Sequence, residues 1–223
     1  MSDVVQVIRK DIGRPSPELV RGLQALPTTA LADFLELDCV MRIDIRPLWP
    51  DIARIAGPAF TVRTLWHDNL ALHAAIYMAA PGDVIVVQAG DHEMAVAGGN
   101  VCAIAQRRGV AGFVVDGVVR DWTESREKGF PLFARGASPI PAPRDGVGGI
   151  NHPIRCGGIT VNPGDVVVAD EEGIVVVPQS RAADVREKAA ARAAADAAES
   201  LDSWEKKHRA RVEALLKAKG YSL

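Results

Sequence analysis

Hydrophobic and polar positions follow one another in short blocks that predict an α/β domain. Short β-branched runs bounded by glycine and proline predict strands. The two clearest runs follow the same proline-glycine-aspartate turn, at 81–87 (PGDVIVV) and 163–169 (PGDVVVA). Residues 59–63 predict another strand, and the alternation of apolar and charged side chains over 42–45 predicts a strand or an extended segment.

Helix start signals stand near the beginning of the chain. Ser16 followed by Pro17 predicts an N-cap with proline at the first helical position, and apolar residues then repeat at helical spacing. A second helix is expected after Pro27. A third is expected through residue 78, with Asp68 or Asn69 as its cap.

The last part of the chain differs in composition from the rest. Residues 181–223 are rich in alanine and charged side chains, which favours a long helix. One apolar stripe steps along it at intervals of three or four residues, formed by Leu201, Trp204, His208, Val212 and Leu215. We predict one domain over residues 1–180 and a helical extension over 181–223 that packs on a neighbouring subunit.

The middle of the chain predicts a βαβ unit, because strand, glycine loop, helix and strand follow in that order from residue 84 to 117. In the loop, Gly98 and Gly99 open the helix, where backbone N–H groups can hold a carboxylate or phosphate. A tight turn that needs glycine is the equally common alternative.

The second strand of this unit ends in VVDGVVRD, in which we expect Asp116-Gly117 to turn the chain and Arg120-Asp121 to open a helix. Ligands of α/β sheets gather at the carboxyl ends of strands, so this pair and the glycine loop are expected to form one site if the strands are adjacent. Arginine offers a planar fork to oxygens, and aspartate offers a hard oxygen to Mg²⁺ or Mn²⁺. The alternative is an N-capping aspartate with a surface salt bridge.

Composition narrows the classes of partner. The 223 residues carry a formal net charge of -2, which gives no general attraction to nucleic acid or to an anionic membrane. We therefore expect small molecules or further copies of the chain as partners. The N-terminal residues lack the apolar core of a signal peptide, and no run is long enough to cross a membrane, so a cytoplasmic location is expected.

Other reactive residue types give weaker signals. Three separated cysteines without CxxC spacing argue against a disulfide framework or a zinc knuckle. The histidines lack HxxxH spacing, and His92, in the loop before Gly98, is more often a solvated or packed histidine than a proton shuttle. No lysine stands in a predicted core strand, which argues against a Schiff base.

Several separated motifs occur in order from about Leu26 to Pro178: RPLWPDIARIAGPAFTVRT, DNLALHAA, GGNVCAIAQRRGVAGFVVDGVVRD, GFPLFARG and CGGITVNPGDVVVADEEGIVVVP. Together they resemble the RraA-like proteins, which include metal-dependent 4-hydroxy-4-methyl-2-oxoglutarate/4-carboxy-4-hydroxy-2-oxoadipate aldolases. The resemblance implies an RraA-like catalytic domain of the swivelling β/β/α type, with N-terminal helices and a long C-terminal helix. It also implies a trimer or a dimer of trimers with active sites between subunits.

The resemblance implies a role for particular residues. Asp121 would be the ligand of Mg²⁺ or Mn²⁺. An acidic residue from the C-terminal helix of the adjacent subunit, Asp196 or Glu199, would assist the base, although the glutamates usual in that helix are largely alanine here. The residues implied to bind the substrate are Gly98, Gly99, Asn100 and Val101 for the pyruvyl carboxylate, Arg120 for the keto or enolate oxygen, and Arg144 for a distal carboxylate.

The implied reaction is cleavage of a 4-hydroxy-2-oxo (di)carboxylic acid to pyruvate and a second carbonyl compound, with oxaloacetate decarboxylation as a side activity. Short members of the family instead regulate a ribonuclease by binding it or its helicase. The N-terminal helical segment and the long tail favour the aldolase over that alternative. A phosphohistidine domain is excluded, since AGGNVCAIAQRRG contains no histidine.

Overall fold

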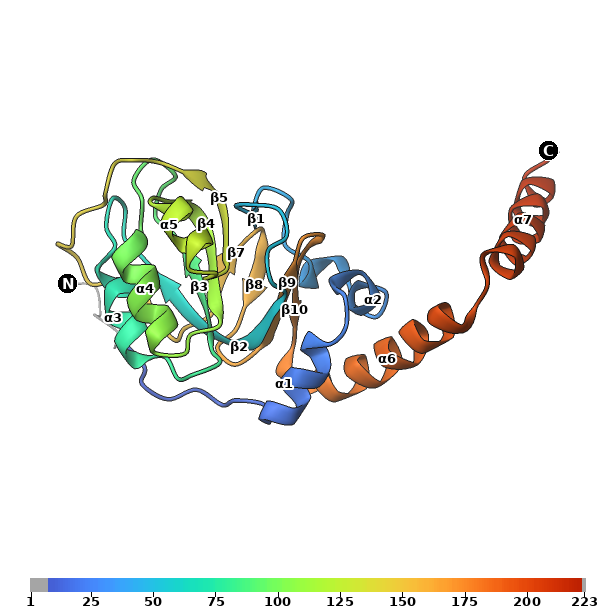
Figure 1. Cartoon of the computed structure of the whole chain (residues 1–223), viewed down its shortest axis with the longest axis horizontal. Coiled ribbons are helices and arrows are strands. Elements are labelled where there is room, and N and C mark those ends of the chain that lie inside the picture. The colour runs from blue at the N-terminus through green and yellow to red at the C-terminus, as the bar shows by residue number, and fades with distance from the viewer. Residues whose placement is uncertain (1–7, 222–223) are drawn as a thin grey trace, which may run out of the picture.

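A computed structural model describes residues 8–221 of the chain (Figure 1). Residues 1–7, at the start of the domain predicted over 1–180, and residues 222–223, at the end of the predicted extension, lie outside the described residues. A mixed α/β body carries an arm of two helices that projects from it (Figure 1). Within residues 8–221, every helix is too short or too polar to cross a membrane.

The body is built around one sheet in the order β1-β5-β4-β3-β2-β9-β10, with β6 paired to β2. Strands β2 to β5 run parallel, whereas β9 pairs antiparallel with both β2 and β10. The strands are β1 (Arg46–Pro47), β2 (Ile55–Arg63), β3 (Val84–Gln88), β4 (Gly112–Val119), β5 (Leu132–Ala137), β6 (Gly149–Ile150), β9 (Val166–Asp170) and β10 (Gly173–Val177). A separate hairpin joins β7 (Ile154–Cys156) and β8 (Ile159–Val161).

Strand β2 links two halves of the sheet. Its first part, from Ile55 to Pro58, pairs with β9, and its second part, from Ala59 to Arg63, pairs with β3. Gly57 stands where the two halves meet, and a Cβ atom there would lie 2.1 Å from a backbone oxygen of the turn before β3. Glycine is therefore required by the close approach of two backbones.

Helices cover the sheet in two groups and make two hydrophobic cores. One core packs α3 and α4 against β2 to β5, and the other packs α1, α2 and α6 against β9 and β10 (Figure 1). The helices are α1 (Pro17–Gln24), α2 (Thr28–Ala32), α3 (Leu70–Met78), α4 (Gly99–Arg107), α5 (Trp122–Glu127), α6 (Ala182–Ala198) and α7 (Leu201–Ala218), with 3₁₀ turns at η1 (Leu37–Cys39) and η2 (Gln179–Arg181).

The predicted helix starts are confirmed. The Ser16 hydroxyl accepts a hydrogen bond of 3.2 Å from the backbone N–H of Leu19 at the start of α1. At the start of α3, Asn69 occupies the cap position, while the carboxylate of Asp68 accepts a hydrogen bond of 2.8 Å from the N–H of Leu70. Both signals are local, which is why the sequence alone revealed them.

The prediction of a strand or an extended segment over 42–45 is wrong. The N–H of Ile45 donates to the carbonyl of Arg42 at 3.2 Å, which closes a turn, and β1 begins only at Arg46. The apparent alternation has another cause: Ile45 is buried in the core, while Ile43 is exposed at the turn. An apolar pair two residues apart fits a turn as well as a strand.

The predicted turn at Asp116-Gly117 is also wrong, because β4 continues through both residues to Val119. In place of a turn, the pairing with β5 shifts register between Val115 and Val118. A Cβ atom at Gly117 would lie 2.5 Å from the Cβ of Ala89. The Asp-Gly pair thus lies at a β-bulge, and its glycine permits a close contact with the neighbouring strand segment.

The C-terminal extension is two helices, since the backbone is extended at Glu199 and Ser200 caps α7 through a 3.3 Å hydrogen bond from Ser203. Helix α6 buries Ala182, Val185 and Ala189 against the body. The side chains described in α7 are all at least partly exposed. The predicted packing of this arm on a neighbouring subunit stays a prediction.

Candidate active site

The glycine loop and the Arg120-Asp121 pair lie at the same edge of the sheet, because β3 and β4 are adjacent and parallel. Backbone hydrogen bonds join the segment after β3 to the end of β4 and to the residue that follows it. The N–H of Val96 donates to the carbonyl of Val118 at 3.0 Å, and the N–H of Arg120 donates to that of Ala97 at 2.9 Å. The topology of the βαβ unit thereby brings both motifs to one place.

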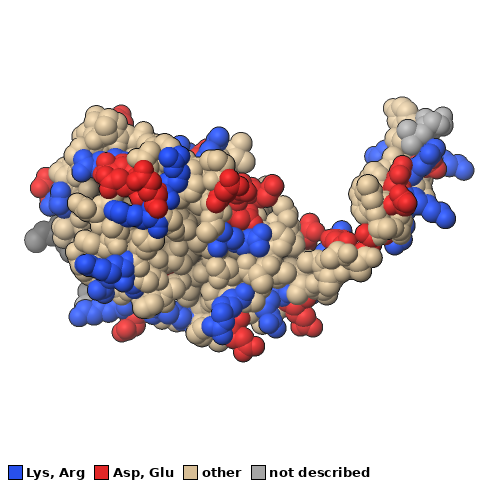
Figure 2. Space-filling view, in the orientation of Figure 1, with Lys and Arg blue, Asp and Glu red and all other residues tan. Residues whose placement is uncertain are grey.

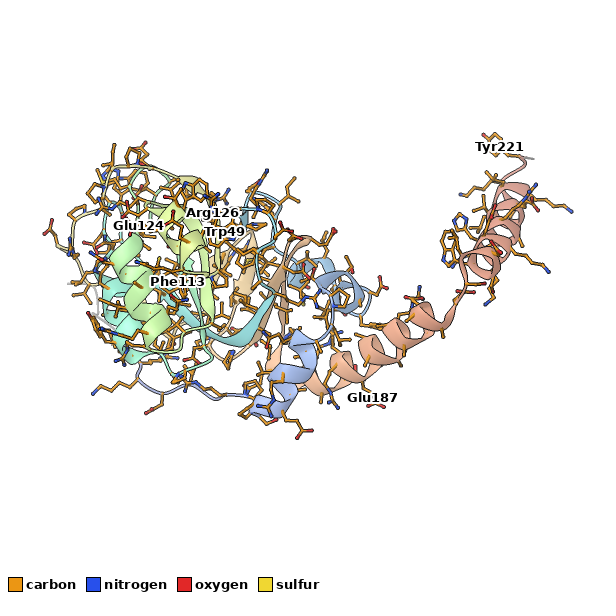
Figure 3. All side chains as sticks on the ribbon, viewed as in Figure 1. Trp49, Phe113, Glu124, Arg126, Glu187 and Tyr221 are labelled. Carbon is orange, nitrogen blue, oxygen red and sulfur yellow. The ribbon has the colours of Figure 1, made fainter. Side chains whose placement is uncertain are left out.

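The two glycines make room for the charged pair. A Cβ atom at Gly98 would lie 2.8 Å from Oδ2 of Asp121 and 3.1 Å from Nε of Arg120. A Cβ atom at Gly99 would lie 2.4 Å from Oε2 of Glu124, a residue that sequence reasoning missed. Figure 3 shows Glu124 on α5, in the part of the body that also contains α4. The sequence offered two reasons for glycine at these positions, a tight turn and the binding of an anion. These close contacts add a third, which is steric.

Asp121 occupies the N-cap position of α5, as the capping alternative required, but its side chain does not cap that helix. Its Oδ2 accepts a hydrogen bond of 3.1 Å from the N–H of Gly99, at the start of α4. The residue holds a left-handed backbone conformation, with φ of 54°, which costs about 1 kcal/mol or more for a residue other than glycine.

The Arg120-Asp121 pair remains open to a ligand. Nε of Arg120 lies 3.5 Å from Oδ2 of Asp121, and the two side chains are 41% and 40% exposed. Charges this accessible interact weakly with each other, so either group can exchange its partner for a bound molecule.

A pocket of about 240 Å³ contains the pair. Two arginines and one aspartate give its lining an excess of positive charge, which suits an anionic ligand. Every predicted substrate residue lines it, and so does the predicted metal ligand. The lining residues are Asn69, His73, Ala95, Ala97, Gly98, Gly99, Asn100, Val101, Arg120, Asp121, Pro141 and Arg144.

Hydrogen bonds to the start of α3 position Arg144. The buried side chain of Asn69 donates to the carbonyl of Ala142 at 3.0 Å. Oδ2 of Asp68 accepts from the N–H groups of Asp145 and Gly146 at 2.6 and 2.9 Å. The loop on both sides of Arg144 is thereby fixed to the helix that forms one wall of the pocket.

Asn69 and His73 are pocket residues that sequence reasoning did not identify as such. The available signal was their spacing, since residues four apart lie on one face of a helix. Burial, together with the positive charge of Arg144, lowers the pKa of His73 below its usual 6.5, and the negative charge of Asp68 opposes this. The imidazole is therefore neutral at pH 7.

Asp196 and Glu199 do not line this pocket, because the arm carries them away from the body of their own chain. Figure 3 shows its course from Glu187 on α6 to Tyr221 beyond α7. Asp196 is paired with Arg192 at 2.9 Å. Glu199 is paired with Lys207 at 2.7 Å, an interaction that lowers the pKa of its carboxyl below 4.5.

The remaining reactive side chains lie elsewhere. His92 is 54% exposed, lies 3.8 Å from Asp116, and is not among the pocket residues. The three cysteines are buried, and burial raises the pKa of Cys102 to about 11, so that its thiol is a poor nucleophile. The seven lysines, all within residues 8–221, are exposed, as expected for a site without a Schiff base.

A divalent ion fits the chemistry at Asp121. Among residues 8–221, one group of three or more His, Cys, Asp or Glu side chains lies close enough together to hold a metal ion. It consists of Glu36, Asp38 and Cys39, and Glu36 is already paired with Arg181. Asp121 would thus be a single carboxylate ligand, with water or substrate supplying the others, which is a common arrangement for Mg²⁺. Its partial exposure leaves room for those ligands.

Acidic and basic side chains are interspersed over the face of the protein shown in Figure 2. This mixture agrees with the small net charge. Recognition of an anion therefore depends on local groups such as Arg120 and Arg144 in the pocket.

Comparison with known proteins connects this geometry to a family. A protein of Halalkalibacterium halodurans named "Putative 4-hydroxy-4-methyl-2-oxoglutarate aldolase" is 40% identical over 182 residues, covering 81% of this chain and 86% of that protein. A Thermus thermophilus protein named 4-hydroxy-4-methyl-2-oxoglutarate aldolase is 35% identical over 128 residues, covering 57% of this chain and 77% of that protein.

A solved structure has the same fold. Streptomyces coelicolor RraAS2, described as an unusual member of the RNase ES inhibitor RraA protein family, superposes with a TM-score of 0.71 at 33% identity. The match covers 89% of this chain and 99% of that chain, and it confirms the predicted fold class. Residues 28–176 match the family described as RraA-like, Aldolase/RraA. The chain belongs to the RraA-like family.

Proposed function

We propose that this protein is an aldolase that uses Mg²⁺ or Mn²⁺ to cleave a 4-hydroxy-2-oxo (di)carboxylic acid to pyruvate and a second carbonyl compound. The observation that carries the proposal is the presence of Arg120, Asp121 and Arg144 in one pocket at the start of α4. The names of the two aldolase relatives support the same reaction class.

The start of α4 is suited to the pyruvyl carboxylate. The N–H groups of Asn100 and Val101 lie in the first turn of the helix, where no intrahelical acceptor exists. Together with the helix dipole they attract an anion. Arg144 carries a second positive charge in the same pocket, which suits the distal carboxylate of a diacid.

Arg120 is suited to the oxygen that gains negative charge during cleavage. As the bond between C3 and C4 breaks, its electron pair moves toward the 2-oxo group, and a guanidinium donor stabilises the resulting enolate. A divalent ion held by Asp121 would supply further positive charge beside that oxygen. Loss of carbon dioxide from oxaloacetate gives the same enolate, so we expect that side activity as well.

The proposal includes the assembly implied by the family, a trimer or a dimer of trimers. The arm of one copy would then bring Asp196 or Glu199 to the pocket of another, where an acidic side chain could assist the base. The exposed apolar residues Leu201, Trp204 and Leu215 on the arm support its docking on a protein surface.

Regulation of a ribonuclease is the second candidate function. The match to RraAS2 favours it, because that structure covers 89% of this chain. The extra helices were expected to separate aldolases from short regulators. Since a member of the inhibitor family matches almost the whole chain, length does not decide between them.

A coupled lactate dehydrogenase assay for pyruvate tests the proposal. We expect turnover of at least one of 4-hydroxy-4-methyl-2-oxoglutarate, 4-carboxy-4-hydroxy-2-oxoadipate and oxaloacetate with Mg²⁺ or Mn²⁺, and none with EDTA. Turnover without metal, or full activity of the Asp121→Ala variant, would contradict it. No turnover with any acid, combined with tight binding to a ribonuclease or its helicase, would favour the regulator.

A further inference from the structure

The pocket has two sides that come from different parts of the chain. One side is the start of α4 and the residues after β4, which we propose hold the 2-oxo acid end of the substrate. The other side is α3 with the loop that follows β5, contributing Asn69, His73, Pro141 and Arg144. A diacid whose oxo-acid end lies against the first side and whose distal carboxylate meets Arg144 would bring its C4 hydroxyl to the second side.

Cleavage requires an acceptor for the proton of the C4 hydroxyl. On the second side of the pocket, the guanidinium of Arg144 has only donor groups, the amide of Asn69 does not take up a proton, and Pro141 has no ionisable group. Among the described residues that line this side, His73 is the one side chain that can accept a proton.

The surroundings of His73 suit that task. Its side chain is partly buried and is engaged by no hydrogen bond or ion pair from residues 8–221, so its ring nitrogens are available to a ligand. The charged groups that act on the ring are Arg144 and Asp68. Asp68 already accepts hydrogen bonds from three backbone N–H groups, so its carboxylate is occupied and is not available as the base.

We propose that His73 accepts the proton of the substrate's C4 hydroxyl while the bond between C3 and C4 breaks. The inference rests on the proposed aldolase function and deepens it. It places the base on the same chain as Arg120 and Asp121, so that Asp196 or Glu199 of a neighbouring copy would have an assisting role only.

The step balances without a further reactant. The proton moves from the C4 hydroxyl to an imidazole nitrogen, and the electron pair of that O–H bond forms the new C4 carbonyl. The pair of the bond between C3 and C4 moves to C3, giving the enolate beside Arg120. Protonation of C3 by solvent then completes the methyl group of pyruvate, and His73 releases its proton to solvent, which restores the neutral imidazole.

Three reactions of the metal-loaded enzyme distinguish acceptance of the C4 hydroxyl proton from a role of His73 in substrate binding, in enolate formation or in the fold. Cleavage of 4-hydroxy-4-methyl-2-oxoglutarate needs the hydroxyl proton to be removed. Decarboxylation of oxaloacetate and exchange of the pyruvate methyl protons in D₂O, followed by NMR, pass through the enolate without that step. We compare His73→Gln and His73→Asn with the wild type, and use His92→Gln, an exposed histidine outside the pocket, as the matched control.

In both His73 variants, we expect kcat for cleavage to fall by about 100-fold or more, while the other two reactions stay within about threefold of the wild type. The acid limb of the kcat profile for cleavage, expected below pH 6.5, should disappear. The His92 variant should match the wild type.

Other outcomes overturn the inference. Retained cleavage in both variants, a rise in KM with unchanged kcat, or a parallel loss of all three reactions would each exclude His73 as the acceptor. A wild-type enzyme that catalyses none of the three reactions would instead refute the proposed function itself, and this inference with it.

Discussion

The backbone N–H of Gly99 donates a hydrogen bond of 3.1 Å to Oδ2 of Asp121, and thereby joins the start of α4 to the start of α5. The two residues are 22 positions apart in the sequence. A carboxylate that could have capped its own helix instead lies at the positive end of a neighbouring one. This contact positions the proposed metal ligand and leaves it partly exposed to the pocket.

Replacing Gly98 by alanine is expected to disturb this arrangement. The new Cβ would lie 2.8 Å from the Asp121 carboxylate, whereas the extended backbone of Gly98 itself accepts any residue. Pyruvate release should fall by at least about tenfold because the carboxylate is displaced. Gly136→Ala, which meets no atom within 4 Å, is the control. Equal kinetics of the two variants would show that the glycine is not required for activity.

Asp121→Asn is expected to weaken metal binding while preserving the fold. The amide keeps the size of the side chain but lacks the negative charge that attracts Mn²⁺, so the affinity should fall by at least about tenfold. Calorimetric titration with Mn²⁺ measures this, and thermal unfolding tests the fold. Glu124→Gln, next to the site but outside the pocket lining, should bind as the wild type does. Unchanged affinity in Asp121→Asn would place the ion elsewhere.

Asp170 is expected to govern part of the acid stability. Burial alone would raise the pKa of this carboxyl, but hydrogen bonds from Thr28 and Arg54 outweigh that effect and lower it below 3.8. A carboxyl whose pKa is lower in the folded than in the unfolded chain stabilises the fold at pH values above its unfolded pKa. This contribution is lost as the pH falls through its folded pKa. The wild type should therefore lose stability below about pH 4.

Urea unfolding at several pH values checks this expectation. At pH 7, Asp170→Asn should lower the free energy of unfolding by about 3 kcal/mol, since it leaves Arg54 without its buried partner. Its stability should also change less than that of the wild type below about pH 4. Asp184→Asn, which breaks an exposed pair with Lys188, should cost less than about 1 kcal/mol. Similar losses in both variants would contradict the assignment.

Removal of residues 200–223 tests the role of helix α7, the outer part of the arm. Helix α7 has no buried residue, so the melting temperature of the body should change little. If the arm docks on a neighbouring copy, light scattering should show a smaller assembly and the coupled assay a lower activity. A truncated protein of unchanged stoichiometry and full activity would show that α7 is required for neither assembly nor activity.

Much of the fold follows from short stretches of sequence. The cap at Ser16, the two proline-glycine-aspartate turns and the order of the βαβ unit are local signals, and each appears where it was predicted. Local signals failed at Asp116-Gly117, where pairing across the sheet overrides the turn preference. Asp116 is engaged there by Arg135 and by the N–H of Gly157.

The candidate site likewise contains residues that the sequence predicted and residues that only contacts in the folded chain reveal. The sequence predicted that Gly98 and Gly99 would meet Arg120 and Asp121 if the two strands were adjacent, and the parallel pairing of β3 and β4 shows that they are. His73 joins them through the tertiary fold alone. It does so through contacts between residues far apart in the chain, such as the hydrogen bonds from the loop around Arg144 to Asp68, and no local propensity encodes such contacts.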